Sequence, residues 1–342
     1  MPRATEKEKP QNHPMEGTND EARFPSSGPA SRGVAFELPA DDGQLLGATR
    51  YEPDGDARGT LIVHGATAVP QRFYRAFSEF YAERGVRVIT YDYRGVGRSR
   101  PTSLRGFHAT MTEWGKLDAR AVHEHVRRHH GGGPLAILGH SFGGQLIGLV
   151  DEMEDADCAV LVGAQLGYYG NWPGAARAKF VFAVHVAIPT LTAAFGYLPG
   201  KFGLGEDLPR GVAEEWAGWC RHPEYLASKH PDAIGRFAGF DRPTLFYSFT
   251  DDVFAPKSAV NHLLGRLSAA PIEHRRRGPR DFDGTPIGHF GFFRRNFSNT
   301  LWPESLAYLV DVFDGRTPER RGRPGDVRMS DVLADLRTHG RQ

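Results

Sequence analysis

Short apolar runs alternate with longer amphipathic stretches along most of the chain. Short apolar runs bounded by turn residues are typical of buried strands, and a spacing of three to four residues between apolar positions is typical of helices. We predict strands at 34–40, 44–53, 60–65, 86–95, 135–141, 158–164, 243–252 and 272–277. We predict helices at 72–85, 112–133, 257–267 and 300–313, and another that starts at Phe142. This alternation indicates an α/β fold, with a mostly parallel sheet covered by helices on both faces.

Turn and cap residues mark the ends of several elements. Asp41, Asp42 and Gly43 separate the first two strands, and Asp-Gly at such a place is a strong hairpin signal. The opening of the sheet is therefore expected to be antiparallel. For the helix at 112–133 we predict Thr112 as the N-cap and a run of glycines as the stop.

The alternation of strands and helices breaks between residues 167 and 241. This segment is rich in aromatic residues, glycine and proline, and it is too long to be a plain loop. Open α/β sheets bind ligands at the carboxyl ends of their strands. We therefore expect the segment 167–241 to form an inserted cap over a site at that edge.

One part of this insertion, residues 180–200, is apolar enough and long enough to cross a bilayer. His185, Pro189 and Pro199 interrupt it, together with threonines and glycines near its end. We expect a helix in the apolar wall of a substrate pocket, and no membrane span.

Composition divides the 342 residues into a core and two polar ends. Residues 1–32 are rich in Pro, Glu, Lys, Asn and Ser, so we expect a disordered tail without a secretory signal. The α/β core is expected at 33–166 and 242–314, around the cap at 167–241. Residues 315–342 are expected to be a polar tail.

Charge and cysteine content exclude several classes of protein. Lys and Arg number 42 and Asp and Glu number 41, so nothing electrostatic favours nucleic acid as a partner. Cys158 and Cys220 are the two cysteines, too few for a disulfide framework, and no metal-ligand spacing occurs. A reducing cytoplasm is the expected location, and neither a metal nor an organic cofactor is expected.

The clearest chemical signal is Gly139-His140-Ser141-Phe142-Gly143, between a predicted strand and a predicted helix. A serine at so sharp a turn takes a strained backbone conformation, and side chains two residues away would collide with neighbouring elements. The turn lifts the hydroxyl above the sheet, and the following helix directs its N-terminal dipole at it. The pattern therefore predicts a nucleophile elbow with Ser141 as the nucleophile.

Together with "VHG" at 63–65 and "DYRGVGRS" at 92–99, this motif resembles the α/β-hydrolase superfamily over roughly residues 34–314. The resemblance implies an eight-stranded, mostly parallel sheet and a triad in the chain order Ser, Asp or Glu, His. The stretches "GYLPG" at 196–200, "GEDLPRGVAEEWAGWC" at 205–220 and "IGHFGFF" at 287–293 are similar to bacterial members of a serine-aminopeptidase-like group.

The resemblance implies a catalytic histidine in the loop between the last strand and the last helix, which is the place of His289. A serine hydroxyl needs such a base to take its proton, and the base needs an acid to hold it. His140 is expected to line the pocket or to be structural, and His64 to belong to the oxyanion loop. The histidines on the helix 112–133 are expected to form a solvated basic face; they are His123, His125, His129 and His130.

The triad acid is expected after the next-to-last strand, where Asp251 and Asp252 are neighbours. The family pattern is an aspartate followed by a proline four residues later, which Asp252 and Pro256 match. Asp252 is preferred, and Asp251 is expected to cap or orient the loop. The alternative is that both aspartates only cap the turn.

An oxyanion hole needs two donors. One is expected to be the amide of Phe142, and the other the amide of Ala66, in the loop that begins with His64 and Gly65.

These residues predict a carboxylesterase-like serine hydrolase that acts through an acyl-enzyme. The aromatic and apolar residues of the cap predict a small-molecule substrate with an apolar acyl or aryl part. An acyltransferase would use the same residues. An aminopeptidase-like enzyme would need an acidic group in the cap to hold an amine, and the candidates are Glu206, Asp207, Glu214 and Glu215. An alternative of another class is a ligand receptor with this fold and no catalysis.

Overall fold

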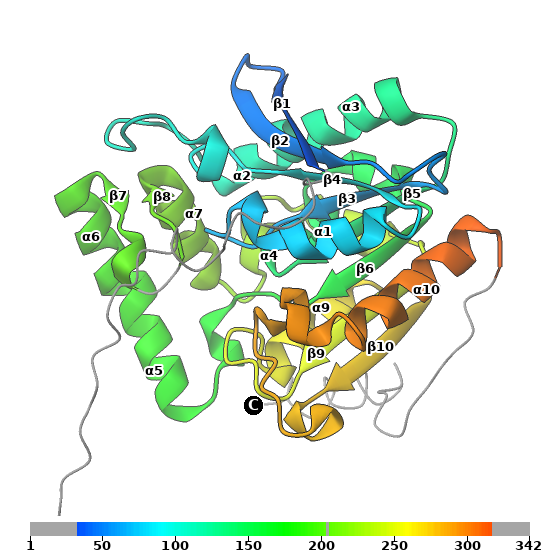
Figure 1. Cartoon of the computed structure of the whole chain (residues 1–342). Helices are drawn as coiled ribbons and strands as arrows, with labels where there is room; N and C mark the ends of the chain where they lie inside the picture. Colours follow the sequence, from blue (N-terminus) through cyan, green and yellow to red (C-terminus); the bar gives the residue numbers. More distant parts are fainter. Residues whose placement is uncertain (1–32, 203–204, 317–342) are drawn as a thin grey trace, which may run out of the picture. The chain divides into compact units, whose positions relative to one another are not determined.

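The computed structural model describes residues 33–202 and 205–316 (Figure 1). Within these residues one sheet has eight strands, in the order β1-β2-β4-β3-β5-β6-β9-β10. β1 and β2 form the predicted antiparallel hairpin, β2 also pairs antiparallel with β4, and all other neighbours are parallel. The strands are β1 (Gly33–Pro39), β2 (Leu45–Tyr51), β3 (Thr60–His64), β4 (Arg87–Tyr91), β5 (Leu135–His140), β6 (Cys158–Val162), β9 (Thr244–Phe249) and β10 (Ile272–Arg277). The predicted α/β-hydrolase sheet is confirmed.

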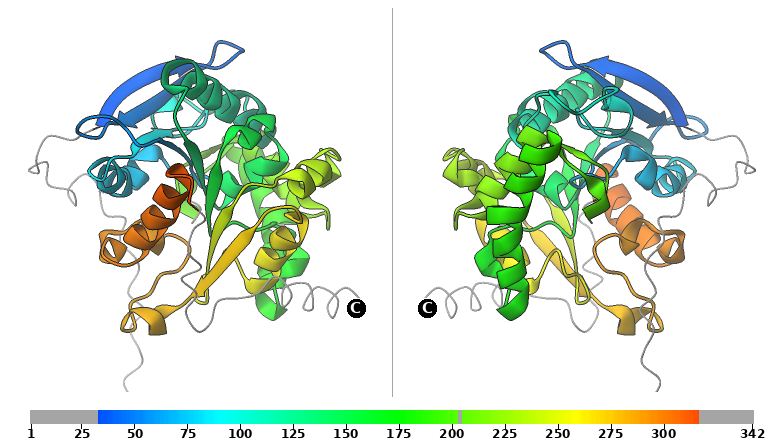
Figure 2. Two further views of the ribbon diagram at one scale, coloured as in Figure 1. Left: turned by 90° about the vertical axis from the view of Figure 1, so that its right-hand side faces the viewer. Right: turned by 90° about the vertical axis from the view of Figure 1, so that its left-hand side faces the viewer.

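Helices cover both faces of this sheet (Figure 2). α1 (Arg75–Ala82) and α10 (Leu301–Phe313) lie on one face, while α3 (Arg120–His130), α4 (Phe142–Gln145) and α9 (Lys257–Arg266) lie on the other. Successive side chains of a strand point to opposite faces, so each buried strand supplies both cores. In β6, Val160 packs with the first set of helices and Leu161 with the second. This two-sided burial explains the uninterrupted apolar runs.

The helix predicted at 112–133 has its N-cap two residues earlier than expected. It runs through α2 (Met111–Glu113), a π-helical segment (Trp114–Ala119) and α3. Thr110 is the N-cap, and its Oγ1 accepts a hydrogen bond of 3.1 Å from the Glu113 amide. The predicted cap, Thr112, donates instead from its amide and its hydroxyl to Glu215, at 2.9 and 2.6 Å. Thr112 therefore lies in the first turn of the helix, where its side chain contacts Glu215 and does not cap the helix.

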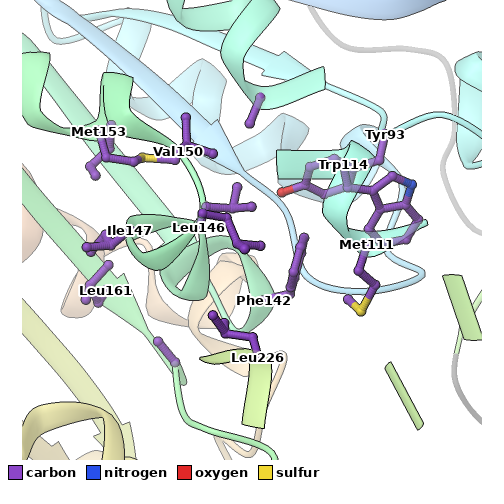
Figure 3. Close-up of a cluster of buried hydrophobic side chains, with 14 of the residues drawn as sticks. Tyr93, Met111, Trp114, Phe142, Leu146, Ile147, Val150, Met153, Leu161 and Leu226 are labelled. Atoms are coloured by element: carbon purple, nitrogen blue, oxygen red, sulfur yellow. The ribbon is translucent and has the colours of Figure 1, made fainter. Parts of the chain in front are cut away.

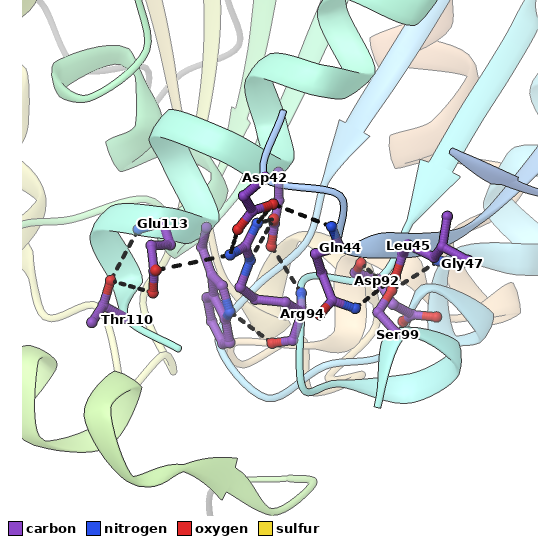
Figure 4. Close-up of polar contacts among 11 residues, drawn as sticks. Asp42, Gln44, Leu45, Gly47, Asp92, Arg94, Ser99, Thr110 and Glu113 are labelled. Atoms are coloured by element: carbon purple, nitrogen blue, oxygen red, sulfur yellow. Dashed lines mark hydrogen bonds and ion pairs between the residues drawn. The ribbon is translucent and has the colours of Figure 1, made fainter. Parts of the chain in front are cut away.

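Arg94 joins three elements at the antiparallel end of the sheet (Figure 4). Its side chain is buried and donates to Asp118 at 2.7 Å and to Asp42 at 2.6 Å. Asp42 belongs to the β1–β2 turn, and Asp118 to the helix that precedes α3. The buried guanidinium thus fixes the hairpin to the core, so Arg94 of "DYRGVGRS" has a structural role.

Segment 167–241 contains a long helix and several shorter elements. α5 (Gly174–Phe182), a π-helical turn (Ala183–Ala187) and α6 (Ile188–Phe195) form one continuous helix. β7 (Tyr197–Leu198) pairs antiparallel with β8 (Leu208–Pro209), and α7 (Arg210–Cys220) and α8 (Ala233–Gly239) follow. The two polar ends predicted at 1–32 and 315–342 lie, apart from residues 315 and 316, outside the described residues.

The long helix does not match the prediction of an apolar pocket wall. Only 17% of its most apolar window is buried, and the buried positions include Val184, Ile188 and Thr192. It is long and apolar enough to cross a membrane, by length and composition. Apolar composition alone does not tell which face of a helix is covered. The sequence therefore predicted a pocket wall, whereas most of this helix is exposed.

Two buried histidines lie side by side between β3 and α3. The Nε2 atoms of His64 and His123 are 3.2 Å apart, and His64 Nδ1 is 2.7 Å from the Tyr91 hydroxyl. Burial, and then the neighbouring His123, holds the pKa of His64 well below its ordinary value, and burial lowers the pKa of His123 to about 4. The prediction of a solvated face is therefore wrong for His123. Its helix turns this side chain inward while His129 is exposed.

This pair makes stability depend on pH. An unfolded histidine takes up a proton below a pH of about 6.5, whereas folded His123 stays neutral down to a pH of about 4. Its contribution is therefore complete above the unfolded pKa and is lost as the pH falls. The free energy of unfolding should fall when the pH is lowered from 7 to 5. In His123→Leu this fall should be smaller than in wild type by about 2 kcal/mol. Urea unfolding at the two pH values measures this loss. The control is His129→Leu on the exposed face, and an equal loss in wild type and His123→Leu would contradict the prediction.

Candidate active site

The Gly-X-Ser-X-Gly segment forms the predicted sharp turn between β5 and α4. Ser141 has φ 52° and ψ −112°, a conformation that non-glycine residues rarely adopt and that costs on the order of 1–3 kcal/mol. Hydrogen bonds hold it there: its amide donates to Val162 O at 2.9 Å, and its carbonyl accepts from the Gly144 amide at 3.0 Å. The side chain is 8% exposed, so the hydroxyl lies at the boundary of the interior.

The glycines of this motif are required by close backbone packing. A Cβ on Gly139 would lie 2.6 Å from the backbone of Gly144, closer than real Cβ contacts. A Cβ on Gly143 would overlap the carbonyl oxygen of His64. α4 therefore approaches β3 and β5 more closely than any side chain allows, and this approach holds the serine at the carboxyl end of β5.

Phe142 anchors the residue after the serine in the core (Figure 3). Its ring is buried, with its centroid 5.8 Å from the ring of Trp114 and 5.7 Å from that of Tyr93. Because the side chain is fixed, the amide at the N-terminus of α4 is fixed as well. This is the place of the first predicted oxyanion donor.

His289 and Asp252 are hydrogen-bonded to each other. His289 Nδ1 lies 2.7 Å from Asp252 Oδ2, and both side chains are buried. The other carboxylate oxygen of Asp252 accepts from the amides of Phe254 and Ala255, at 2.8 and 3.0 Å. With Nδ1 donating to the carboxylate, the Nε2 of a neutral His289 is left as a proton acceptor.

The two neighbouring aspartates hold different parts of the same loop. Asp251 Oδ2 accepts from the amides of Ile287 and Gly288, at 2.8 and 3.0 Å. Asp252 contacts the ring of His289, and Asp251 the backbone just before it. Asp252 thus makes the contact with His289 that a triad acid would make. Asp251 lies where it can orient the loop, as the sequence led us to expect.

Two short connections bring Ser141 and His289 to one place. Ser141 is bonded to Val162, and the next residue, Gly163, would place a Cβ 3.2 Å from His289 Nδ1 and 3.4 Å from Asp252 Oδ2. The side chain before the serine, His140, has its Nε2 2.9 Å from the carbonyl oxygen of His289. The three residues predicted as a triad therefore converge at the carboxyl ends of β5, β6 and β9.

The second predicted oxyanion donor already has a partner. The Ala66 amide donates to the hydroxyl of Tyr74 at 2.9 Å. Gly65 lies against the same ring, where a Cβ would be 3.2 Å from Tyr74. Nothing in the sequence marks Tyr74, which belongs to a 3-10 turn before α1 and enters the site only because that turn packs on the loop after β3.

Tyr74 continues into a chain of hydrogen bonds whose directions are defined. His140 Nε2 faces a carbonyl oxygen, so this nitrogen carries the proton; burial holds the pKa of His140 well below its ordinary value, so Nδ1 is an acceptor. Nδ1 lies 2.8 Å from the Tyr74 hydroxyl, which therefore donates to it. The chain runs from Ala66 N–H through Tyr74 and His140 to the backbone of His289. His140 is thus structural, one of the two roles expected of it.

His64, expected to belong to the oxyanion loop, is the last residue of β3, and its side chain is buried in the core. Its side chain lies against Tyr91 and His123, and its carbonyl oxygen lies under α4 at Gly143. The backbone of His64 thus packs against the first turn of α4, next to the turn that holds Ser141. Motif position alone places His64 near the site, but the direction of its side chain follows from β-strand alternation.

Aromatic rings surround His289 on its open side. The ring centroids of Phe254 and Phe290 lie 5.4 and 5.1 Å from that of His289. Phe254 remains 42% exposed, so an apolar surface adjoins the imidazole. Among the described residues, no group of three or more His, Cys, Asp or Glu side chains has an arrangement that could hold a metal ion.

Comparison with known proteins agrees with this geometry. The model of the alpha/beta hydrolase family matches residues 60–295. A search of curated proteins finds no significant relative.

Solved structures similar to this chain include a haloalkane dehalogenase variant from Bradyrhizobium elkanii, with 11% identity, a TM-score of 0.57 and coverage of 83% of this chain and 98% of that one. A 2,6-dihydroxy-pseudo-oxynicotine hydrolase has 15% identity, a TM-score of 0.56 and coverage of 85% and 72%. An esterase from Exiguobacterium antarcticum has 17% identity, a TM-score of 0.53 and coverage of 81% and 99%. At these identities the likeness concerns the fold, and it is the family match over most of the chain that shows that this protein belongs to the alpha/beta hydrolase family.

Proposed function

We propose that this protein is a serine hydrolase that cleaves acyl esters through Ser141, His289 and Asp252. One observation carries the proposal: the His289–Asp252 hydrogen bond of 2.7 Å lies beside a serine in a strained turn. A buried, oriented imidazole next to an elbow serine is the arrangement that activates a hydroxyl for nucleophilic attack.

The proposed reaction has two halves. Ser141 Oγ attacks the ester carbonyl while its proton passes to His289 Nε2. The tetrahedral intermediate then collapses, the C–O bond to the alcohol breaks, and His289 returns the proton to the leaving oxygen. In the second half a water molecule gives its proton to His289 and attacks the acyl-enzyme, which releases the acid and restores Ser141.

Asp252 supports this cycle without titrating in it. Its two backbone donors keep the carboxylate in place, and the bond to Nδ1 fixes the tautomer that leaves Nε2 free to accept. When His289 gains a proton, the adjacent negative charge stabilises the imidazolium.

The oxyanion is proposed to bind at the N-terminus of α4, where Phe142 N–H points from a helix end. We propose the Ala66 N–H as the second donor. Before substrate binds, this N–H donates to the hydroxyl of Tyr74. An oxyanion accepting from Ala66 would then displace this hydroxyl, which keeps its bond to His140.

The surroundings favour an ester with an apolar part. Phe254 and Phe290 flank the imidazole, and the serine at position 141 disfavours dehalogenase chemistry, which needs a carboxylate there. The Exiguobacterium neighbour, an esterase, has the same fold. An acyltransferase using the same three residues is a second candidate, because an alcohol or amine could replace water.

The acidic residues of the cap give an aminopeptidase no free carboxylate. Glu206 pairs with Arg72, Asp207 with Arg100, and Glu214 with Arg210, each at 2.8 or 2.9 Å. Glu215 accepts from Thr112. All four side chains bind other parts of the chain, which favours an ester over a substrate amine.

The two cysteines are buried and free. Burial raises the pKa of Cys158 to about 12 and that of Cys220 well above its ordinary value, so both stay protonated and unreactive. We propose a reducing compartment, the cytoplasm, as the location.

Removing the nucleophile tests the proposal directly. Ser141→Ala should lower kcat by about 10⁴-fold or more and abolish covalent labelling by a fluorophosphonate. The matched control is Ser248→Ala, because Ser248 Oγ lies 2.8 Å from a histidine nitrogen, that of His274, but in the core away from the site. Labelling that persists in Ser141→Ala would assign the nucleophile to another residue, and labelling that never occurs in wild type would support a receptor instead.

The neighbouring aspartates offer a matched pair of variants. Asp252→Asn should lower kcat by about 10⁴-fold, because the wrong tautomer of His289 is then favoured. Asp251→Asn should cost less than about tenfold, since it weakens only two backbone hydrogen bonds. The measurement is kcat on one ester with the fold checked by circular dichroism. A larger loss in Asp251→Asn would transfer the acid role to that residue.

A panel of p-nitrophenyl esters defines the substrate. We expect kcat/KM to rise by about threefold to fourfold for each added methylene, until the acyl chain fills the apolar surface beside His289. Aminoacyl amides run in parallel should be turned over far more slowly. Faster cleavage of the amides would overturn the ester assignment, and product formation that rises with an added alcohol would identify an acyltransferase.

A further inference from the structure

The long helix of the cap presents an open apolar face to the outside. In the right-hand view of Figure 2 the continuous helix Gly174–Phe195 runs across the face turned to the reader. Phe182 is 60% exposed and Val186 47% exposed. The exposed positions Ala175, Lys179, Phe182, Val186, Thr190 and Ala193 follow one another at three or four residues, as along one side of a helix.

Trp172, just before this helix, joins it to the loop that carries the proposed triad acid. The indole N–H of Trp172, just before α5, donates to Val253 O at 3.0 Å, and its ring packs on Phe180 at 4.7 Å. Val253 is 74% exposed and follows Asp252, while the next residue, Phe254, lies against His289. Of the seven large hydrophobic side chains exposed in the described part of the chain, four lie on this helix or on the loop joined to it by Trp172: Phe182, Val186, Val253 and Phe254.

The charges on this helix have one sign. Gly174–Phe195 contains no Asp or Glu, and its first turns carry Arg177 and Lys179, both exposed. The nearby Glu214 on α7 is occupied by Arg210 and by the hydroxyl of Thr192. An apolar stripe with cations at one end and an indole beside it has the composition of helices that lie in the headgroup region of an anionic bilayer.

We infer that this surface, defined by Phe182, Val186, Val253 and Phe254 with Arg177 and Lys179 beside it, docks on an anionic lipid bilayer. The helix lies on the membrane and does not cross it, since Val184 and Thr192 are held by Arg221 and Glu214 of the cap. The loop of Asp252 then faces lipid. Resting on the proposed function, the substrate is an acyl ester dissolved in the membrane, which enters beside Phe254.

A second copy of the chain is the competing occupant. A stable protein interface takes in about 20–30 residues from each side. The exposed apolar surface consists of one side of one helix and a short loop, with like charges that two copies would bring together. These features favour a lipid surface, whose affinity needs only a few inserted side chains and basic residues.

The test measures binding separately from catalysis. Full-length protein carrying Ser141→Ala is sedimented with vesicles of phosphatidylcholine alone and of phosphatidylcholine mixed with phosphatidylglycerol. We expect binding to the anionic vesicles that falls as salt is raised. Because this variant is inactive by design, its binding stands whether or not the protein proves to be an esterase, and failure to label Ser141 in wild type would affect only the substrate assignment.

Matched variants locate the surface. Phe182→Ser combined with Val186→Ser should lower the vesicle partition coefficient by about tenfold or more. Lys179→Glu should lower it at least about fivefold on anionic vesicles only. Val34→Ser, which removes an equally exposed side chain from β1, is the control and should change nothing. Absence of vesicle binding, or equal binding by the double variant, overturns the proposal; a dimer in sedimentation velocity that Phe182→Ser and Val186→Ser dissociate would assign the face to a second copy.

Discussion

The site depends on one steric constraint, the approach of the α4 backbone to the strands β3 and β5. Glycine at 139 and 143 lets the backbone of Gly144 and the carbonyl of His64 come closer than any Cβ permits. This approach turns the chain back sharply enough to force Ser141 to a positive φ. Fixing Phe142 in the core then secures the turn, so packing energy from apolar side chains sustains a conformation that is locally unfavourable.

Around this turn, hydrogen bonds from separate elements set the positions of the residues proposed to react. Asp252 fixes the ring of His289, and Asp251 fixes the backbone just before it. A second chain, from Ala66 through Tyr74 and His140, reaches the carbonyl of His289 from the opposite side. The loop after β10 is thus held at both its side chain and its backbone. Because several contacts hold this loop, the position of His289 stays within narrow limits before any substrate binds.

Much of this could be predicted from sequence because it follows from local rules. Buried parallel strands form apolar runs, so all eight strands of the sheet were predicted within a few residues, and the glycines around Ser141 predicted the turn. The failures concern contacts between distant residues. Thr112 was predicted as the N-cap because its hydrogen bonds to Glu215 are not visible from the sequence, and the Ala66 amide was assigned without knowledge of Tyr74. His123 and the long helix Gly174–Phe195 were mispredicted for the same reason. Periodicity shows which residues share one face of a helix, but it does not show what other part of the chain covers that face.

His140, which is buried beside His289, affects the charge of the site. The ring of His140 lies 5.1 Å from that of His289, and two imidazolium ions at this separation would repel each other. His140 donates one hydrogen bond to the carbonyl oxygen of His289 and accepts one from the hydroxyl of Tyr74, the pattern of an uncharged imidazole. In the proposed reaction His289 can therefore become positive, with Asp252 as its partner and the neutral ring of His140 as its neighbour. The enzyme gains a second ring for shape and orientation without adding a competing cation.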